Sequence, residues 1–172
     1  KVGPEDDGGV RTLAALRNEV EAAAEARADL LSEYRAAVDA SPIAAEVAAL
    51  QSIKGCAFAL AAAFSAEVGD FTRFDSPDKL LAYAGMSPST YQSGQLKNCY
   101  PHMEKRGSRY LRYALYSATK YVCHWDPTFA DYLAKKRAEG KHYNIAISHA
   151  AKKLVRLIFA MEKSRQPYCS AL

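Results

Sequence analysis

Apolar residues recur at helical spacing along most of the chain, and breaks rich in Gly and Pro separate the periodic segments. From Val10 to Ala40 the spacing is three to four residues, which predicts an amphipathic helix of about 30 residues. At 1.5 Å per residue such a helix extends about 45 Å, more than a small domain covers. The pattern therefore indicates coiled-coil-like packing on another helix, in the same chain or in a partner.

Shorter helices are predicted after this one, each bounded by a capping or breaking residue. Ser41-Pro42 predicts a helix that runs to about Leu50, and Ser76-Pro77-Asp78 caps one that ends at Gly85. No segment alternates convincingly with a period of two, so the fold class is all-α. The remaining predicted helices are 56–68, 104–123, 127–139 and 142–164.

The domain organisation follows from these elements. Residues 1–9 read as a flexible terminus or linker, 10–40 as the long connecting helix and 41–172 as one compact helical domain. Within that domain, residues 86–103 hold two prolines, one glycine and several Ser, Thr and Asn without a period. Loops of this length in a compact domain are usually functional or disordered.

Composition narrows the class of protein. With 49% apolar and 24% charged residues the chain buries a real core. The most apolar run, Cys56 to Phe64, is too short to span a membrane, and there is no signal-peptide pattern, so we expect a cytoplasmic protein with no membrane partner. The start at Lys1 rather than Met suggests a fragment.

The charge is unevenly distributed. The net charge is +4, but residues 1–94 carry 8 Lys and Arg against 14 Asp and Glu, whereas residues 95–172 carry 15 against 5. A balance of +10 in the second half favours a polyanionic partner such as DNA. A solvated basic face is the alternative explanation.

The four cysteines have no C-x-x-C spacing, so free thiols are expected. Cys99 with His102, and Cys123 beside His124, are conceivable zinc ligands, but no second ligand pair has finger-like spacing. We therefore predict no metal site and no cofactor in this chain.

The tripeptide Gln92-Ser93-Gly94 lies in the long loop and is followed by several cations. A serine hydroxyl needs a base, a metal or positive charge to attack a phosphodiester, and Gly94 allows a backbone that pushes Ser93 outward. Ser and Gly also occur in ordinary turns, which is the alternative. The cations expected to contact phosphates are Lys97, Lys105, Arg106, Arg109 and Arg112.

Ordered motifs extend on both sides of this serine. They are Tyr83-Ala84-Gly85, Pro88, Gln92-Ser93-Gly94, His102-Met103, Lys105-Arg106-Gly107-Ser108 and Tyr110-Leu111-Arg112, with Asp126-Pro127 to Pro167-Tyr168 beyond. Together they resemble the C-terminal domain of the Piv-type insertion-sequence transposases over about 120 residues, back to about Leu50. Pro101 stands where that family usually has glycine, which leaves the path of the loop open.

The resemblance implies a function in DNA transposition or site-specific recombination. Ser93 matches the serine proposed to form a 5′-phosphoserine intermediate with DNA, with Tyr91, Gln92 and Gly94 supporting it. Many members are guided by a structured bridge RNA. The metal-binding carboxylates, and with them Mg²⁺, belong to a RuvC-like N-terminal domain that this chain does not include, so we expect the isolated chain to be inactive.

Other segments are candidates for nucleic-acid contact. Lys54 and Gly55 lie in a helix-hairpin-helix-like turn, although Ala57 replaces the family's second glycine, and a plain helical connection is equally consistent. Lys120 alternates with tyrosines that either stack on bases or pack in the core. Lys152 and Lys153 lie on a phosphate-facing or merely solvated surface, and Trp125 is expected to be a buried anchor.

Three interpretations of function follow. The first is the serine domain of a transposase, the second a non-catalytic helix-hairpin-helix DNA-binding module, and the third an oligomerisation domain built on the helix 10–40. The first requires a covalent DNA adduct at Ser93. The second predicts DNA affinity without an adduct, and the third predicts self-association independent of nucleic acid.

Overall fold

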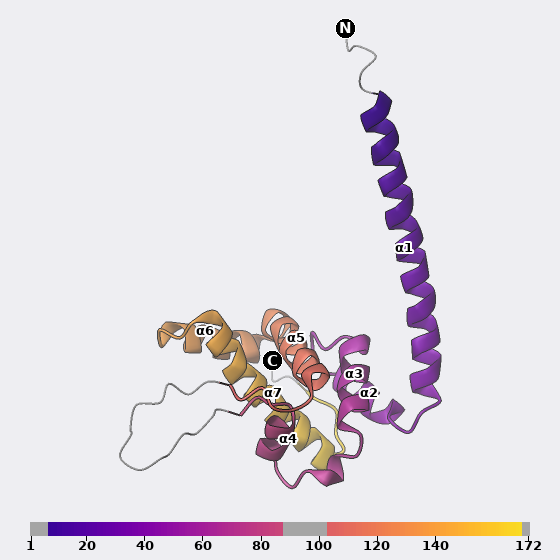
Figure 1. Ribbon diagram of the computed structural model, residues 1–172. Helices are drawn as coiled ribbons and strands as arrows, with labels where there is room; N and C mark the ends of the chain where they lie inside the picture. The colour runs from indigo at the N-terminus through magenta and orange to yellow at the C-terminus, as the bar shows by residue number, and fades with distance from the viewer. Residues whose placement is uncertain (1–6, 88–102, 170–172) are drawn as a thin grey trace. The chain divides into compact units, whose positions relative to one another are not determined.

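The computed structural model describes residues 7–87 and 103–169. Its described part consists of helices, turns and loops and contains no β-strand, so the all-α prediction is confirmed. The chain divides after Pro42 into two compact units (Figure 1). None of the described helices has the combination of length and apolar character that a membrane span requires.

The first unit consists of one long helix, α1 (Asp7–Asp39), which begins slightly earlier than the sequence predicts. Leu13, Val20 and Leu30 are each about two-thirds exposed. The chain turns after α1 where Ser41 donates its hydroxyl to the Val38 carbonyl at 2.6 Å. Ser41 therefore closes one helix, and the prediction that it caps the next is wrong.

The second unit contains the remaining described helices. Ser76 caps the helix that begins at Pro77, as predicted, and Asp126 caps the helix that begins at Pro127. They accept from the backbone N–H of Lys79 and of Phe129, both at 3.3 Å. The elements are α2 (Ala44–Gln51), α3 (Phe58–Val68), a 3₁₀ turn η2 (Phe71–Arg73), α4 (Pro77–Tyr83), α5 (Arg109–Trp125), α6 (Pro127–Ala138) and α7 (Tyr143–Ser164).

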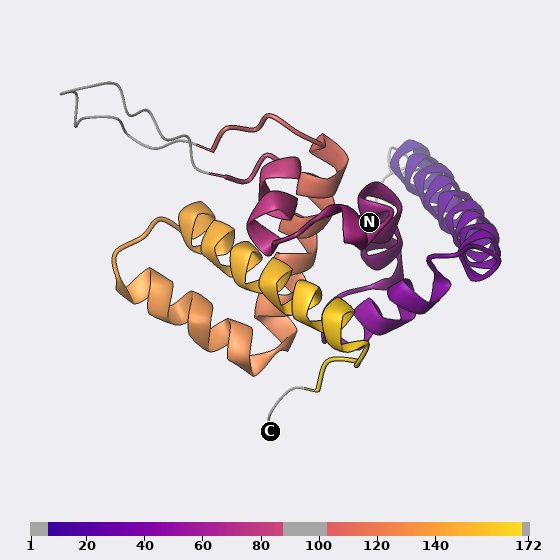
Figure 2. The same cartoon turned by 90° about the horizontal axis from the view of Figure 1, so that it is seen from below.

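Helix α5 lies at the centre of this unit and packs against α3, α6 and α7 (Figure 2). Its buried face carries Leu111, Leu115 and Val122, each 1% exposed or less. Burial of each such side chain contributes about 1.5–3 kcal/mol. One face of α5 is thus fixed in the core, and the opposite face is open to solvent.

The start of α5 differs from the prediction. The sequence pattern places it at Glu104, whereas the helix begins at Arg109 after the N-cap Ser108. Lys105 and Gly107 have φ values of +55° and +146°, which a right-handed helix cannot include. The five residues that precede α5 form a separate structure instead.

Candidate functional site

The chain forms a closed neck on either side of residues 88–102. We define the neck as Tyr83–Ser87 together with Met103–Ser108. Three backbone hydrogen bonds join the two segments of the neck. They run from Glu104 N–H to Ser87 O at 3.1 Å, from Lys105 N–H to Gly85 O at 3.0 Å and from Ser108 N–H to Tyr83 O at 3.0 Å. The neck therefore brings the two ends of the predicted serine loop together.

Two glycines allow the two segments of the neck to approach each other. A Cβ on Gly107 would lie 2.2 Å from the Tyr83 carbonyl oxygen, and one on Gly85 would lie 2.9 Å from the Lys105 carbonyl carbon. Both residues also have positive φ. Any side chain at either position would push the two segments apart, so the neck requires glycine at both positions for steric and conformational reasons.

Side chains of α5 attach the neck to the helical body. The Arg112 guanidinium donates through Nη1 to the carbonyls of Ala84 at 3.0 Å and Lys105 at 3.3 Å. Ser108 accepts from the Leu111 N–H at 3.1 Å and donates to the Glu67 carboxylate of α3 at 2.5 Å. At least one of the Arg112 donors is thus used structurally rather than being free for a phosphate.

The neck presents cations to solvent. Lys105 and Arg106 are exposed, and neither forms an ion pair with any residue that the structure describes. Arg109 follows at the exposed start of α5, where its guanidinium stacks 4.8 Å from the Tyr110 ring centroid. Lys105 adopts the left-handed conformation, which costs a non-glycine residue about 1–2 kcal/mol. Such strain is typical of sites where surrounding contacts fix the backbone.

The remaining loop residues of the predicted site lie outside the described part of the chain. These are Ser93, its neighbours Tyr91, Gln92 and Gly94, and Lys97. The structure places the neck from which their segment extends, and their catalytic and phosphate-binding roles stay predictions.

The turn between α2 and α3 packs directly on α5. Gly55 has φ +94°, and a Cβ there would lie 2.6 Å from the backbone carbonyl of Tyr121. This close approach explains the glycine without a phosphate ligand, although Lys54 beside it is exposed. Helix, turn and helix are present as predicted, and the phosphate grip of the hairpin stays a prediction.

The other predicted basic residues have different surroundings. Lys120 is exposed on α5, and its ammonium lies 4.9 Å from the Tyr116 ring centroid. On α7, Lys152 is partly exposed, while Lys153 reaches α6, where its ammonium lies 4.9 Å from the ring centroids of Phe129 and Tyr132. Cation–π contact therefore accounts for Lys153 in the fold.

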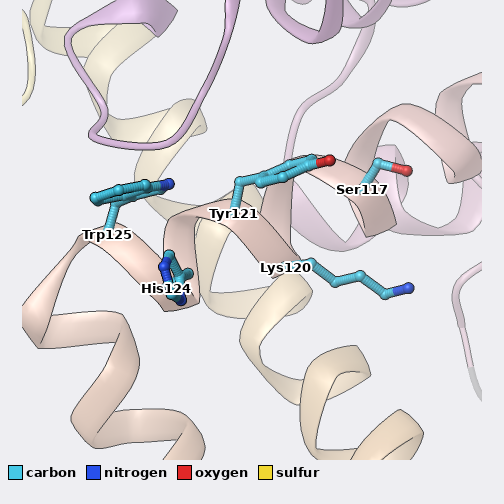
Figure 3. A pocket seen from close by; sticks show the side chains of 5 residues that line it. All are labelled: Ser117, Lys120, Tyr121, His124 and Trp125. Carbon is cyan, nitrogen blue, oxygen red and sulfur yellow. The ribbon is translucent and has the colours of Figure 1, made fainter.

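Trp125 is not the buried anchor that its position suggests, because 62% of it is exposed. It lines a hollow of about 560 Å³ on the outer face of α5, together with Ser117, Lys120, Tyr121 and His124 (Figure 3). The sequence pattern indicated Lys120 and the tyrosines near it on the same helix, but it did not indicate the hollow. The signal was the aromatic pair at positions i and i+4 of one helix.

Two of the acidic residues that precede the loop, Asp70 and Asp75, have structural partners. Asp70 accepts from both the N–H and the hydroxyl of Thr72, and these hydrogen bonds lower its pKa. Asp75 pairs with Lys79, which lowers the Asp75 pKa in the same way. No group of three or more potential ligands forms a metal site within the described residues. Burial raises the pKa of the Cys123 thiol to about 11, so it is not the thiolate that zinc prefers.

A carboxyl pair lies on α2 and α7, apart from the neck. Burial and, to a lesser extent, the nearby Glu162 carboxylate raise the pKa of Glu46 to about 7, although the buried Ser65 hydroxyl offsets part of this shift. Ser65 forms no well-aligned hydrogen bond with any described group. Because burial also raises the Glu162 pKa, the folded chain favours protonation of this pair.

Comparison with known proteins identifies relatives among insertion elements. Residues 47–134 match the model of the transposase IS116/IS110/IS902 family. The 43.6 kDa protein of insertion element IS110 from Streptomyces coelicolor is 30% identical over 146 residues, which is 85% of this chain and 35% of the relative. The 44.8 kDa protein of IS116 from Streptomyces clavuligerus is 29% identical over 122 residues, 71% of this chain and 30% of the relative.

A third relative is the 42 kDa protein of IS900 from Mycobacterium paratuberculosis, 30% identical over 118 residues, or 68% of this chain and 29% of the relative. The chain thus spans about a third of the length of the curated relatives that it matches. The family match includes the whole neck, the hollow on α5 and most of α6.

Proposed function

The chain belongs to the IS116/IS110/IS902 family of transposases, and on that premise we propose that it is the DNA-handling part of a transposase in which Ser93 attacks the DNA backbone. The attack forms a 5′-phosphoserine bond and releases the 3′-hydroxyl of the cut strand. The neck is the observation that carries this proposal, because it fixes both ends of the serine segment beside exposed cations.

The cations of the neck suit phosphoryl transfer. Charge builds up on the phosphate oxygens as the serine attacks, and preorganised positive groups stabilise that charge without rearrangement. Lys105 and Arg106 are exposed beside the segment, and Arg109 begins the helix behind them. Lys105 is held in position by its own backbone hydrogen bond to Gly85. These three residues are therefore the best-placed phosphate contacts among those the structure describes.

The described carboxylates do not fit a Mg²⁺ site. Both oxygens of Asp70 are used by Thr72, and Asp75 and Asp78 pair with Lys79 and Arg156 from separate elements. We therefore derive no step through a metal in this chain, and we propose that a RuvC-like part of the longer protein holds Mg²⁺. The 172-residue chain alone should then bind DNA without cutting it. Serine-dependent nicking of supercoiled plasmid by the chain alone, with Mg²⁺ or Mn²⁺ present, would contradict this division.

The covalent intermediate provides the direct test of function. In the full-length transposase, Ser93→Ala should abolish the denaturation-resistant protein–DNA species and leave DNA binding nearly unchanged. Ser87→Ala is the matched control, because it removes a nearby hydroxyl from the neck without touching the backbone carbonyl that pairs with Glu104. An adduct at normal yield in the Ser93→Ala protein would leave the non-catalytic DNA-binding module as the better interpretation.

Helix α1 favours self-association as a second function. Its exposed apolar side chains repeat along 33 residues, as expected of a helix that packs on another copy. They are Val10, Leu13, Leu16, Val20 and Leu30. We propose that α1 joins copies of the protein and that the assembled protein binds a structured guide RNA in addition to DNA.

A further inference from the structure

The outer face of α5 exposes large aromatic side chains. Tyr121 is 55% exposed and Trp125 is 62% exposed, one helical turn apart, and both line the hollow in Figure 3. Aromatic surface of this size is normally buried or used for contact. Because the opposite face of α5 is fixed in the core by Leu111, Leu115 and Val122, these rings cannot turn inward.

The hollow is preorganised around the indole. The His124 ring lies edge-on to Trp125, with centroids 4.8 Å apart and planes at 89°. All five lining side chains come from α5, so the hollow is an open surface, and its volume of about 560 Å³ is ample for one nucleobase. On the same turns of the helix, Lys120 is exposed at its rim.

The charges around the rings select the ligand. Lys120 lines the hollow beside Tyr121, and α5 has no Asp or Glu in its 17 residues. The α2–α3 turn, which packs on the Tyr121 backbone through Gly55, adds the exposed Lys54. Flat aromatic rings beside cations fit a ligand with planar bases and a phosphate backbone. An apolar peptide would leave Lys54 and Lys120 without an anionic partner.

We propose that the hollow on α5 binds unpaired nucleotides of a single strand, with a base stacked on Trp125 and the adjoining phosphate held by Lys120. Tyr121 adds a second stacking surface one helical turn away. The inference rests on the proposed function only in that the ligand is nucleic acid. A continuous duplex cannot use the hollow, because its bases already stack on each other. DNA and RNA strands share the required chemistry.

Intrinsic fluorescence tests the proposal, because Trp125 is the only tryptophan of the chain. Titration of the 172-residue chain with oligo(dT) or oligo(rU) should quench its emission saturably, and the tighter of the two identifies the source of the strand. A duplex of equal length should not quench it. Lys120→Ala should flatten the dependence of log affinity on log salt by about 0.7, as expected for one phosphate contact on a single strand.

A matched pair of variants separates stacking from general exposure of aromatics. Tyr121→Ala should weaken single-strand binding roughly 5- to 150-fold, the range for loss of one stacked base. Tyr143→Ala removes another exposed tyrosine, at the start of α7, and should leave the affinity unchanged. Equal effects of the two substitutions, or no quenching by either strand, would overturn the inference.

Duplex binding measured in parallel distinguishes this failure from failure of the proposed function. If the chain binds duplex DNA with the expected salt dependence but single strands leave Trp125 emission unchanged, only the hollow proposal is wrong. If neither single strands nor duplex bind, the proposed function fails with it.

Discussion

Substitution of Gly107 should destabilise the protein more than substitution of Gly140, another glycine with positive φ. Gly107 and Gly140 both have positive φ, +146° and +79°. A Cβ on Gly107 would lie 2.2 Å from the Tyr83 carbonyl oxygen, well inside the 3.0 Å limit of real Cβ contacts, whereas a Cβ on Gly140 would meet no atom within 4 Å. The pair thus separates steric overlap from backbone strain.

The magnitudes follow from these contacts. Gly140→Ala should cost about 1 kcal/mol of unfolding free energy, from backbone strain alone. Gly107→Ala should cost about 3 kcal/mol, because backbone strain is joined by separation of the two neck segments and loss of the Ser108 N–H bond to Tyr83. Against a typical total of roughly 5–15 kcal/mol, that difference is readily measured.

Urea denaturation followed by circular dichroism measures both costs, with the m-value checked for constancy. The two variants should differ by about 2 kcal/mol. Equal losses within about 0.5 kcal/mol would show that the neck yields at little cost and does not fix the residues on either side of the serine segment.

Three further predictions concern charge, association and pH. Changing Lys105 and Arg106 together to Ala should flatten the slope of log affinity for duplex DNA against log salt by between about one and two units, and an unchanged slope would assign both to a solvated surface. Sedimentation of the chain with and without residues 1–40 should show self-association only when α1 is present; two monomers at tens of micromolar would refute that role. Because the folded-state pKa of Glu46 is raised to about 7, the stability that Glu46 contributes to the folded protein should be fully present below about pH 4.5 and be lost as pH rises through 7. Glu46→Gln should therefore remove about 1–2 kcal/mol of pH-dependent destabilisation near pH 8, after allowance for solvent screening of this half-exposed group, and urea denaturation at pH 5 and pH 8 measures it.

Signals within a few residues along the chain were enough to predict most of the helices. The cap Ser76 binds the backbone N–H of a residue three positions away, so the sequence alone predicts it. The long period of α1 is equally local. Helices α4 and α6 begin at Pro77 and Pro127 as the pattern predicts, whereas α1 begins slightly earlier than predicted.

The errors arise where distant residues decide the backbone. Residues 104–108 look helical in isolation, but their hydrogen bonds go to Tyr83, Gly85 and Ser87, about 20 residues earlier. Nor does Trp125 reveal its exposure locally, because that depends on which face of α5 is buried by α3, α6 and α7. The role of Arg112 as a clamp on two neck carbonyls is likewise a tertiary property.

The closed neck has a consequence for how this protein can diverge. Because Ser87 and Glu104 are already joined by a hydrogen bond, the body of the domain does not depend on how many residues connect them. For a flexible connection, each doubling of its length costs only about 0.6 kcal/mol of closure entropy. The serine segment can therefore change in length or sequence while the helices keep their packing. Such changes offer a route to new nucleic-acid contacts.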